Sequence, residues 1–184
     1  TSDGMADLAP VVATNGERIL VAWRQVASSQ TDAITTFDTK DYIMYAVSED
    51  QGETWTQPQP IYNGTSGSVK GIEAAMLDSG EAAVVFTLQT GEHNVRTGDF
   101  QQEVVYAVID KPAQGEAELL ADGTPAEYQV VRYVQLTDDE AMDENPQIAA
   151  VKLKNSDEQE SFVIGWSSTS GVNENQENDI RLAA

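Results

Sequence analysis

The densest group of side chains that could do chemistry lies between residues 137 and 145, which read Thr-Asp-Asp-Glu-Ala-Met-Asp-Glu-Asn. This run carries five carboxylates in nine residues, and hard cations such as Ca²⁺ prefer oxygen ligands of this kind. Its spacing does not follow the EF-hand pattern, and most acidic runs are solvated linkers. We therefore predict no metal site and no cofactor, with a Ca²⁺ site at Asp138, Asp139 and Asp143 as the alternative.

The other reactive residue types do not form a catalytic set. His93 is the only histidine, and it lies in a segment rich in Gly, Asn and Thr with no nucleophile motif beside it. The chain has no cysteine, which excludes disulfides and thiolate metal sites. We therefore predict no catalytic residue and interpret His93 as a solvated loop residue.

The composition limits the partners of this protein. Its 184 residues include 31 acidic and 10 basic ones, for a formal net charge of −21. Phosphate binding needs a basic surface, so we predict no nucleic-acid partner. No apolar run reaches the roughly 18 residues that a membrane-spanning helix needs, so we predict no membrane insertion. The chain starts without Met or a signal peptide, and we expect an internal piece of a longer protein.

The elements that must position these residues follow a pattern that repeats three times. Each unit has a weak strand-like segment, an apolar run that ends in a large aromatic residue, and a third strand. The apolar runs are 18–23, 81–86 and 161–166. The segments before them are 10–13, 72–76 and 146–150, and the strands after them are 41–47, 102–108 and 178–184. A fourth strand is predicted at 59–62 and at 128–134.

Turn residues and the absence of helical periodicity complete this prediction. Asn, Asp and Gly residues separate the first two segments of each unit, as in β-hairpins. No stretch shows a sustained 3.6-residue repeat with caps. The sequence therefore predicts an all-β fold with little or no helix.

Residues 48–55 read Ser-Glu-Asp-Gln-Gly-Glu-Thr-Trp and directly follow a predicted strand. The Asp50 carboxylate can accept backbone N–H bonds and hold a tight loop, and Gly52 can adopt a positive φ. The hydroxyls of Ser48 and Thr54 can bond nearby backbone groups, and we expect Trp55 to anchor the turn in the core. These five roles are structural, so the motif predicts a turn rather than a reaction.

This turn resembles the Asp box of the sialidase/BNR-repeat β-propellers. The resemblance implies antiparallel four-stranded blades of a partial Asp-box β-propeller over residues 1–184, with units at about 8–66, 67–137 and an incomplete unit at 143–184. Only the first unit has a complete Asp box, because residues 109–116 lack the Ser, Thr and Trp. A closed propeller needs about 4–8 blades. We therefore expect the remaining blades of a parent protein, or self-association, to cover the open edges.

The family includes sialidases as well as non-catalytic surface and binding proteins, so the resemblance leaves the function open. A sialidase would have an arginine cluster, a Tyr–Glu nucleophile pair and an Asp acid/base. No arginine here stands in the Arg-Ile-Pro context of that family. Arg24 could face the propeller axis, but we interpret it as a polar residue that ends a strand. Tyr42, Tyr45 and Tyr106 are interpreted as packing residues.

The preferred hypothesis is a non-catalytic BNR/Asp-box repeat module of a larger bacterial protein, secreted or at the cell surface. Long insertions at one repeated position would emerge on one face of such an array and could bind a glycan or a protein. These insertions are residues 26–40, 90–101 and 168–177. The alternative is a fragment of a sialidase-like glycoside hydrolase whose catalytic residues lie mostly outside this segment.

Overall fold

The computed structural model describes residues 5–27, 41–64, 68–89, 101–152, 160–170 and 177–184. All regular elements in these ranges are β-strands, so the prediction of an all-β fold is confirmed. Within the same ranges no helix is long and apolar enough to cross a membrane. The strands are β1 (Met5–Thr14), β2 (Ile19–Ala27), β3 (Asp41–Ser48), β4 (Gln59–Tyr62), β5 (Val69–Met76), β6 (Ala82–Gln89), β7 (Gln102–Asp110), β8 (Gln129–Gln135), β9 (Met142–Lys152), β10 (Glu160–Ser170) and β11 (Glu177–Ala183).

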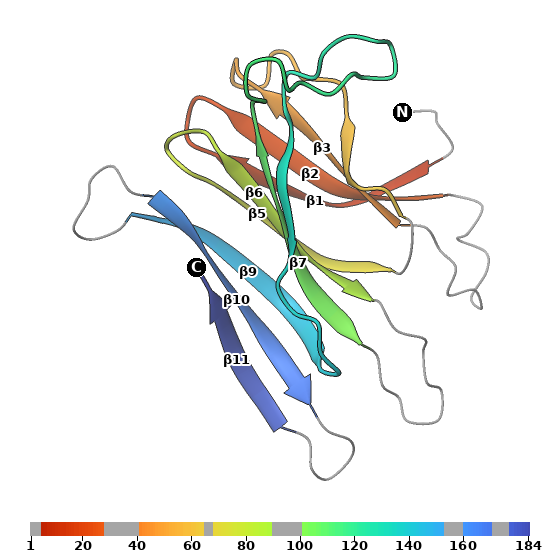
Figure 1. Ribbon diagram of the computed structural model, residues 1–184, viewed down its shortest axis with the longest axis vertical. Coiled ribbons are helices and arrows are strands. Elements are labelled where there is room, and N and C mark those ends of the chain that lie inside the picture. Colours follow the sequence, from red (N-terminus) through yellow and green to blue (C-terminus); the bar gives the residue numbers. More distant parts are fainter. Residues whose placement is uncertain (1–4, 28–40, 65–67, 90–100, 153–159, 171–176) are drawn as a thin grey trace.

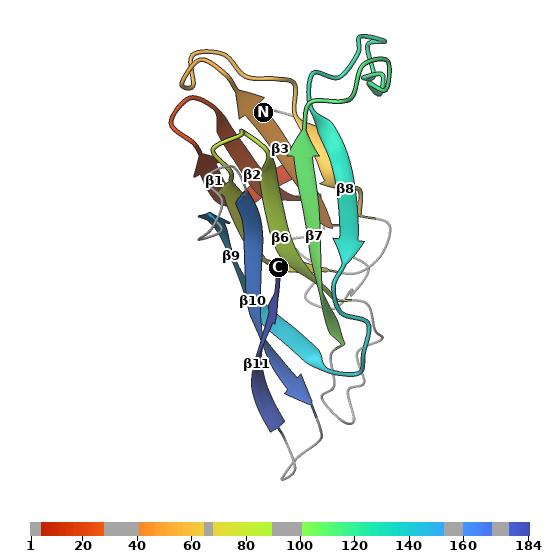
Figure 2. The ribbon, with the colours of Figure 1, turned by 60° about the vertical axis from the view of Figure 1, so that its left-hand side comes forward.

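The strands form three antiparallel meanders, which we call sheet one (β1–β4), sheet two (β5–β8) and sheet three (β9–β11). Sheet two lies between the other two (Figure 1), and β8 is its outer strand beside β7 (Figure 2). Among the described residues, one parallel bridge from Gln102 of β7 to Met142 of β9 links sheets two and three. β5 contacts both β1 and β9, so the first strands of the three sheets lie side by side.

A bulge with a left-handed residue recurs in the first strand of each sheet. Ala9, Gly71 and Asn145 have φ angles of 48°, 50° and 53°, and each lies at a register shift against the second strand of its sheet. The bulges lie beside the aromatic residues that end the apolar runs, Trp23, Phe86 and Trp166. Positive φ is costly for residues other than glycine, so three equivalent occurrences indicate a backbone geometry that the fold imposes.

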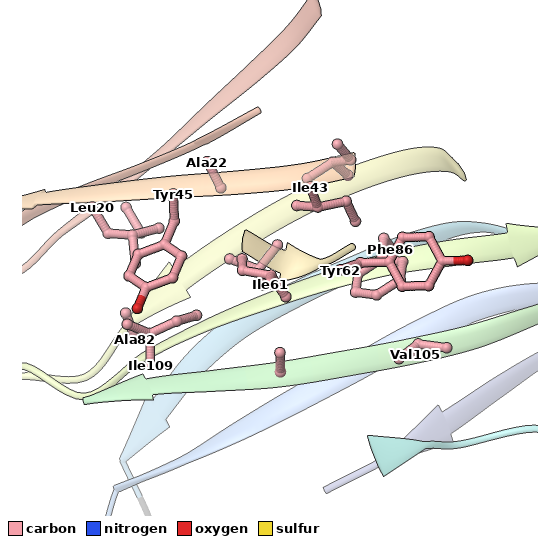
Figure 3. Packing of buried hydrophobic residues seen from close by; sticks show 14 of the residues in the cluster. Leu20, Ala22, Ile43, Tyr45, Ile61, Tyr62, Ala82, Phe86, Val105 and Ile109 are labelled. Atoms are coloured by element: carbon pink, nitrogen blue, oxygen red, sulfur yellow. The ribbon is translucent and has the colours of Figure 1, made fainter. Parts of the chain in front are cut away.

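The larger core lies between sheets one and two (Figure 3). Phe86 is fully buried there, and its ring centroid lies 6.2 Å from that of Tyr62. A smaller core between sheets two and three contains Val85, Val104, Ile164 and Trp166. Because successive strand residues face opposite sides, Phe86 packs toward sheet one and Val85 toward sheet three. Sheet two is therefore buried on both faces, as the burial along β6 shows.

The outer faces of sheets one and three carry exposed apolar side chains. On sheet one, Val12 is 60 % exposed and Trp23 is half-buried, on the side opposite to the core residue Ala22. On sheet three, Ile180 and Leu182 are 77 % and 72 % exposed, on the face of β11 that points away from sheet two. Each end of the stack thus has an apolar face that its neighbours within the described chain do not fill.

Candidate functional site

Most buried polar side chains of the described residues lie at one end of the sheets, which we call the polar end. The C-terminal ends of β2, β6 and β10 point toward this end and away from the turn at residues 48–55, which we call the Asp-box turn after the motif that it resembles (Figure 1). The buried polar side chains at the polar end are those of Asp41, Thr87, Gln102, Glu103, Thr137, Asp143 and Ser168. The buried Ser48 lies at the opposite end. Buried polar groups are costly unless they are paired, so their concentration marks the polar end as the candidate site.

Three carboxylates, those of Glu103, Asp139 and Asp143, meet at the polar end and form what we call the acidic cluster. One oxygen from each lies within 4.8 Å of the others. Glu103 lies near the start of β7, Asp143 near the start of β9, and Asp139 on the connection between β8 and β9. The bridge from Gln102 to Met142 brings the first two together, because each bridge residue directly precedes a carboxylate of the cluster.

Asp143 is the most deeply buried member of the acidic cluster. It has no solvent exposure, and neither of its carboxylate oxygens has a hydrogen-bond partner among the described residues. Its register partner on β10 is Ser168, whose buried hydroxyl also has no partner within the described chain. A buried, unpaired charge is strongly unfavourable. Asp143 is therefore the group at the polar end that most needs a cation or a donor.

Glu103 is 2 % exposed, and its carboxylate accepts hydrogen bonds from the Thr137 hydroxyl and from the backbone of Asp139. Thr137 Oγ1 donates to Glu103 Oε2 at 2.6 Å, and the same hydroxyl accepts the backbone N–H of Val104 at 2.9 Å. Burial raises the pKa of Glu103, and the charges of Asp143 and Asp139 raise it further, against the opposing effect of the Thr137 bond. Burial and the neighbouring carboxylates therefore disfavour the charged form of Glu103.

Asp139 is the outermost member, and its side chain is 41 % exposed. The backbone N–H of Ala141 donates to its Oδ1 at 2.8 Å, and Arg181 Nη1 donates to its Oδ2 at 2.9 Å. These two bonds, the backbone one first, lower the pKa of Asp139. Arg181 thus balances the carboxylate nearest to solvent, while Asp143 below it stays unpaired among the described residues.

Another buried carboxylate, that of Asp41, lies between sheets one and two and has a cation of its own. Its Oδ2 accepts bonds from Arg24 Nη2 at 2.7 Å, from Ser68 Oγ at 3.0 Å and from the backbone N–H of Val69 at 2.8 Å. β2 continues to Ala27, so the prediction that Arg24 ends a strand is wrong. Arg24 instead neutralises Asp41 from within the strand.

The Asp-box turn follows β3 at the other end of the molecule. Asp50 Oδ1 accepts the backbone N–H of Thr54 and the hydroxyl of Ser48, both at 2.8 Å, and Thr54 Oγ1 donates to Oδ2 at 2.5 Å. These bonds, led by that of the Thr54 hydroxyl, lower the pKa of Asp50 to about 2. Gly52 has a φ of 96°, and its N–H donates to Ser48 Oγ at 2.8 Å. The motif residues thus bond one another to close the turn.

Trp55 does not lie in the core, so that expectation is wrong. Its side chain is 43 % exposed, and its indole N–H donates to the backbone carbonyl of Gly52 at 3.1 Å. The indole ring lies against Gly52 and bonds back to the turn itself, so it does not reach into a core between sheets. Trp55 therefore closes the Asp-box turn from outside.

A Tyr–Glu pair lies near the Asp-box turn, where Tyr128 donates a hydrogen bond to Glu49. Lys111 Nζ and Arg18 Nη2 also contact Glu49 Oε1, at 2.8 Å and 3.0 Å. The Lys111 and Tyr128 bonds lower the pKa of Glu49 to about 2, while burial raises the pKa of Tyr128, which is 1 % exposed. A nucleophile needs access to its substrate and an activated oxygen. We therefore interpret this pair as a link between sheets one and two.

No protein-family model matches this chain, and no curated protein matches it either. The resemblance to Asp-box propellers therefore depends on residues 48–55 and on the repeated strand pattern. What the polar end can do must be inferred from its own side chains.

The structure separates the candidate ligands of the acidic run. It brings Asp139 and Asp143 together and leaves Asp138 exposed and outside the cluster. Sequence reasoning missed Glu103, which lies far from the run along the chain. The signal that could have found it is a carboxylate that directly precedes the run Val104–Ile109 within a buried strand.

Two further sequence predictions fall on other parts of the chain. Tyr45 is buried in the core between sheets one and two, as predicted for a packing residue, and its hydroxyl donates to the Tyr128 carbonyl at 3.0 Å. His93 and most of the three long insertions, at 28–40, 90–100 and 171–176, lie outside the described residues.

Proposed function

We propose that this chain is a non-catalytic Asp-box repeat module whose three sheets are consecutive blades of a β-propeller, within a larger bacterial protein that is secreted or held at the cell surface. The observation that supports this most is the equivalence of Trp23, Phe86 and Trp166. Each lies in the second strand of its sheet, beside the bulge of the first strand. Phe86 is buried in the core shared with sheet one, and Trp166 in the core shared with sheet two.

Trp23 occupies the same place on sheet one, but its face is only partly covered. A blade before sheet one would bury Trp23 and Val12 in the way that sheet one buries Phe86. A blade after sheet three would cover Ile180 and Leu182, which are 77 % and 72 % exposed. Burial of one large apolar side chain contributes about 1.5–3 kcal/mol. Both outer faces therefore favour a neighbouring blade, from the parent protein or from a second copy.

The isolated chain is expected to self-associate through these faces. In sedimentation velocity, Leu182→Lys should reduce the dimer or oligomer fraction relative to the unchanged chain. Leu119→Lys is the matched control, because Leu119 is 71 % exposed but lies on the connection between β7 and β8. A chain that stays monomeric at every concentration and binds no apolar dye would contradict the proposal of open blades.

Glycan or protein binding at the polar end is the second part of the proposal. It is supported by the buried polar side chains that gather there, since binding residues are often carried by connections at one end of a rigid sheet scaffold. We expect a ligand found by glycan or peptide arrays to be lost when residues 90–100 are replaced by a Gly-Ser linker. Binding that survives this replacement but is lost with changes near the Asp box would place the site at the other end.

The hydrolase alternative has less support from the described residues. That alternative places the catalytic residues mostly outside this segment, and in the Tyr128–Glu49 pair of the described residues the tyrosine is covered and has a raised pKa. Hydrolysis of a sialoside by the isolated chain, lost in Tyr128→Phe, would overturn the non-catalytic proposal.

A further inference from the structure

We propose that the acidic cluster of Glu103, Asp139 and Asp143 binds one Ca²⁺ ion, which ties sheet three to sheet two. The inference does not depend on the propeller or on any ligand of the polar end. It rests on how the three carboxylates meet and on the unpaired state of one of them.

The geometry of the cluster fits a hard cation. The three ligand oxygens lie within 4.8 Å of one another, which is compatible with one shared Ca²⁺, because two oxygens at about 2.3–2.6 Å from the same ion lie at most about 5 Å apart. The ligands come from β7, from the connection before β9 and from β9 itself. One ion would therefore join two sheets that share a single backbone bridge among the described residues.

Asp143 gives the independent reason for a cation. Acidic residues often gather on a surface without binding anything, and this protein has a net charge of −21. Asp143, however, is fully buried with both oxygens unpaired among the described residues, and its oxygen lies in the cluster. The hydroxyl of Ser168 on the opposite strand is also buried and unpaired within the described chain. A cation held by Asp143 would satisfy a charge that the described side chains do not.

The ligand types select the metal. The cluster offers only oxygen atoms, and no His is described near it and the chain has no Cys, which disfavours zinc and copper. Mg²⁺ demands near-ideal octahedral geometry and keeps several waters, whereas Ca²⁺ accepts irregular sets of carboxylates. A set of three carboxylates on two sheets, two of them buried, therefore suits Ca²⁺ better than Mg²⁺.

Arg181 is the competing explanation for the charge balance. It binds Asp139 on the exposed side at 2.9 Å, and its guanidinium leaves both Asp143 oxygens without a hydrogen bond. If Arg181 were the intended counter-ion, the cluster would not need a metal. The experiment must therefore separate binding inside the cluster from diffuse attraction to an acidic surface.

Calorimetric titration of the EDTA-treated full chain with CaCl₂ and with MgCl₂ makes this separation. We expect one saturable Ca²⁺ site, weaker Mg²⁺ binding, and a higher melting temperature with Ca²⁺. Asp143→Asn should weaken Ca²⁺ binding by about tenfold or more, because it removes a charged ligand. Asp138→Asn is the matched control: it removes the same charge from the same run but lies outside the cluster, and it should change the affinity by less than about twofold.

The melting temperature of Asp143→Asn relative to the unchanged chain is expected to change sign with Ca²⁺, which diffuse Ca²⁺ binding would not produce. Without Ca²⁺, Asp143→Asn should melt higher than the unchanged chain, and with Ca²⁺ this order should reverse. If Asp143→Asn does not fold, Glu103→Gln takes its place in the titration with the same expected loss. The proposal is overturned if the unchanged chain shows no saturable Ca²⁺ binding, or if the cluster variants bind Ca²⁺ as well as Asp138→Asn does.

Discussion

At the polar end, the junction between sheets one and two holds the buried carboxylate of Asp41, and the junction between sheets two and three holds that of Asp143. Both side chains have no solvent exposure. Asp41 receives a guanidinium, a hydroxyl and a backbone N–H, while Asp143 receives no hydrogen bond from the described residues. The buried carboxylate of the first junction thus has a cation bonded to it, while that of the second has none bonded to it among the described residues.

The two junctions differ in the residue that follows the aromatic residue of the second strand. Arg24 follows the aromatic Trp23 in β2, and the equivalent residue after Phe86 in β6 is the uncharged Thr87. Thr87 Oγ1 donates to the backbone carbonyl of Lys70 at 2.8 Å and so serves the backbone of its own sheet. The second junction therefore has no positive charge at the position that neutralises the first.

The first strands of sheets two and three also differ at one equivalent position. Val69 of β5 lies opposite the residue two places after Phe86, and Asp143 of β9 lies opposite the residue two places after Trp166. An apolar side chain at the first junction is thus replaced by a carboxylate at the second. Equivalent junctions of a repeated fold thus differ in charge: the first has an internal ion pair, and we propose that the second binds an external ion.

The largest expected effect comes from breaking the first junction. Asp41→Ala leaves the partly buried Arg24 without its charge partner and should destabilise the chain by about 3–5 kcal/mol. Urea unfolding measures this, with Asp138→Ala as the control for loss of an exposed carboxylate. A cost below about 1 kcal/mol, typical of surface pairs, would mean that the Arg24–Asp41 pair does not hold the junction.

The second junction should respond with the opposite sign. In EDTA, Asp143→Asn removes a buried charge that has no described partner, and we expect it to raise the free energy of unfolding by about 1–2 kcal/mol. The same urea experiment measures both variants side by side. Destabilisation of similar size to Asp41→Ala would show that Asp143 already has a strong partner.

The sequence predicted the strands of both junctions because apolar and aromatic runs indicate buried strands without knowledge of their neighbours. The acidic cluster could be predicted only in part. Asp139 and Asp143 stand close together in the sequence, but Glu103 joins them only through the β7–β9 bridge. The recurring bulge could not be predicted from the sequence for a similar reason. Its backbone geometry is imposed by strand register, and three different residue types adopt it.

Arg181 offers a smaller test of the comparison. Arg181 and Asp139 are both about 40 % exposed, so Arg181→Gln should cost at most about 1 kcal/mol in the absence of Ca²⁺. Because the guanidinium also repels a bound cation, the variant should bind Ca²⁺ as tightly as the unchanged chain or more tightly. Calorimetry and urea unfolding check the two effects, and loss of Ca²⁺ binding in Arg181→Gln would contradict the placement of the ion.

The smallest effect is expected at the Asp-box turn, remote from both junctions. The pKa of Asp50 is lowered to about 2, against an ordinary value of about 3.9. Its contribution to stability is therefore present above pH 4 and is lost as the pH falls toward 2. Asp50→Asn should flatten the pH dependence of the melting temperature in this range without altering Ca²⁺ binding. An unchanged acid profile would show that the turn does not depend on the ionised carboxylate.

Hydrogen exchange with mass spectrometry, on the full chain with EDTA and then with saturating Ca²⁺, tests most directly whether the second junction is completed by a cation. We expect Ca²⁺ to slow exchange in β9, β10, β11 and the start of β7, and to leave sheet one, with its internal Arg24–Asp41 pair, unchanged. Exchange that is unaffected by Ca²⁺, or that slows equally in sheets one and three, would contradict the proposed difference between the two junctions.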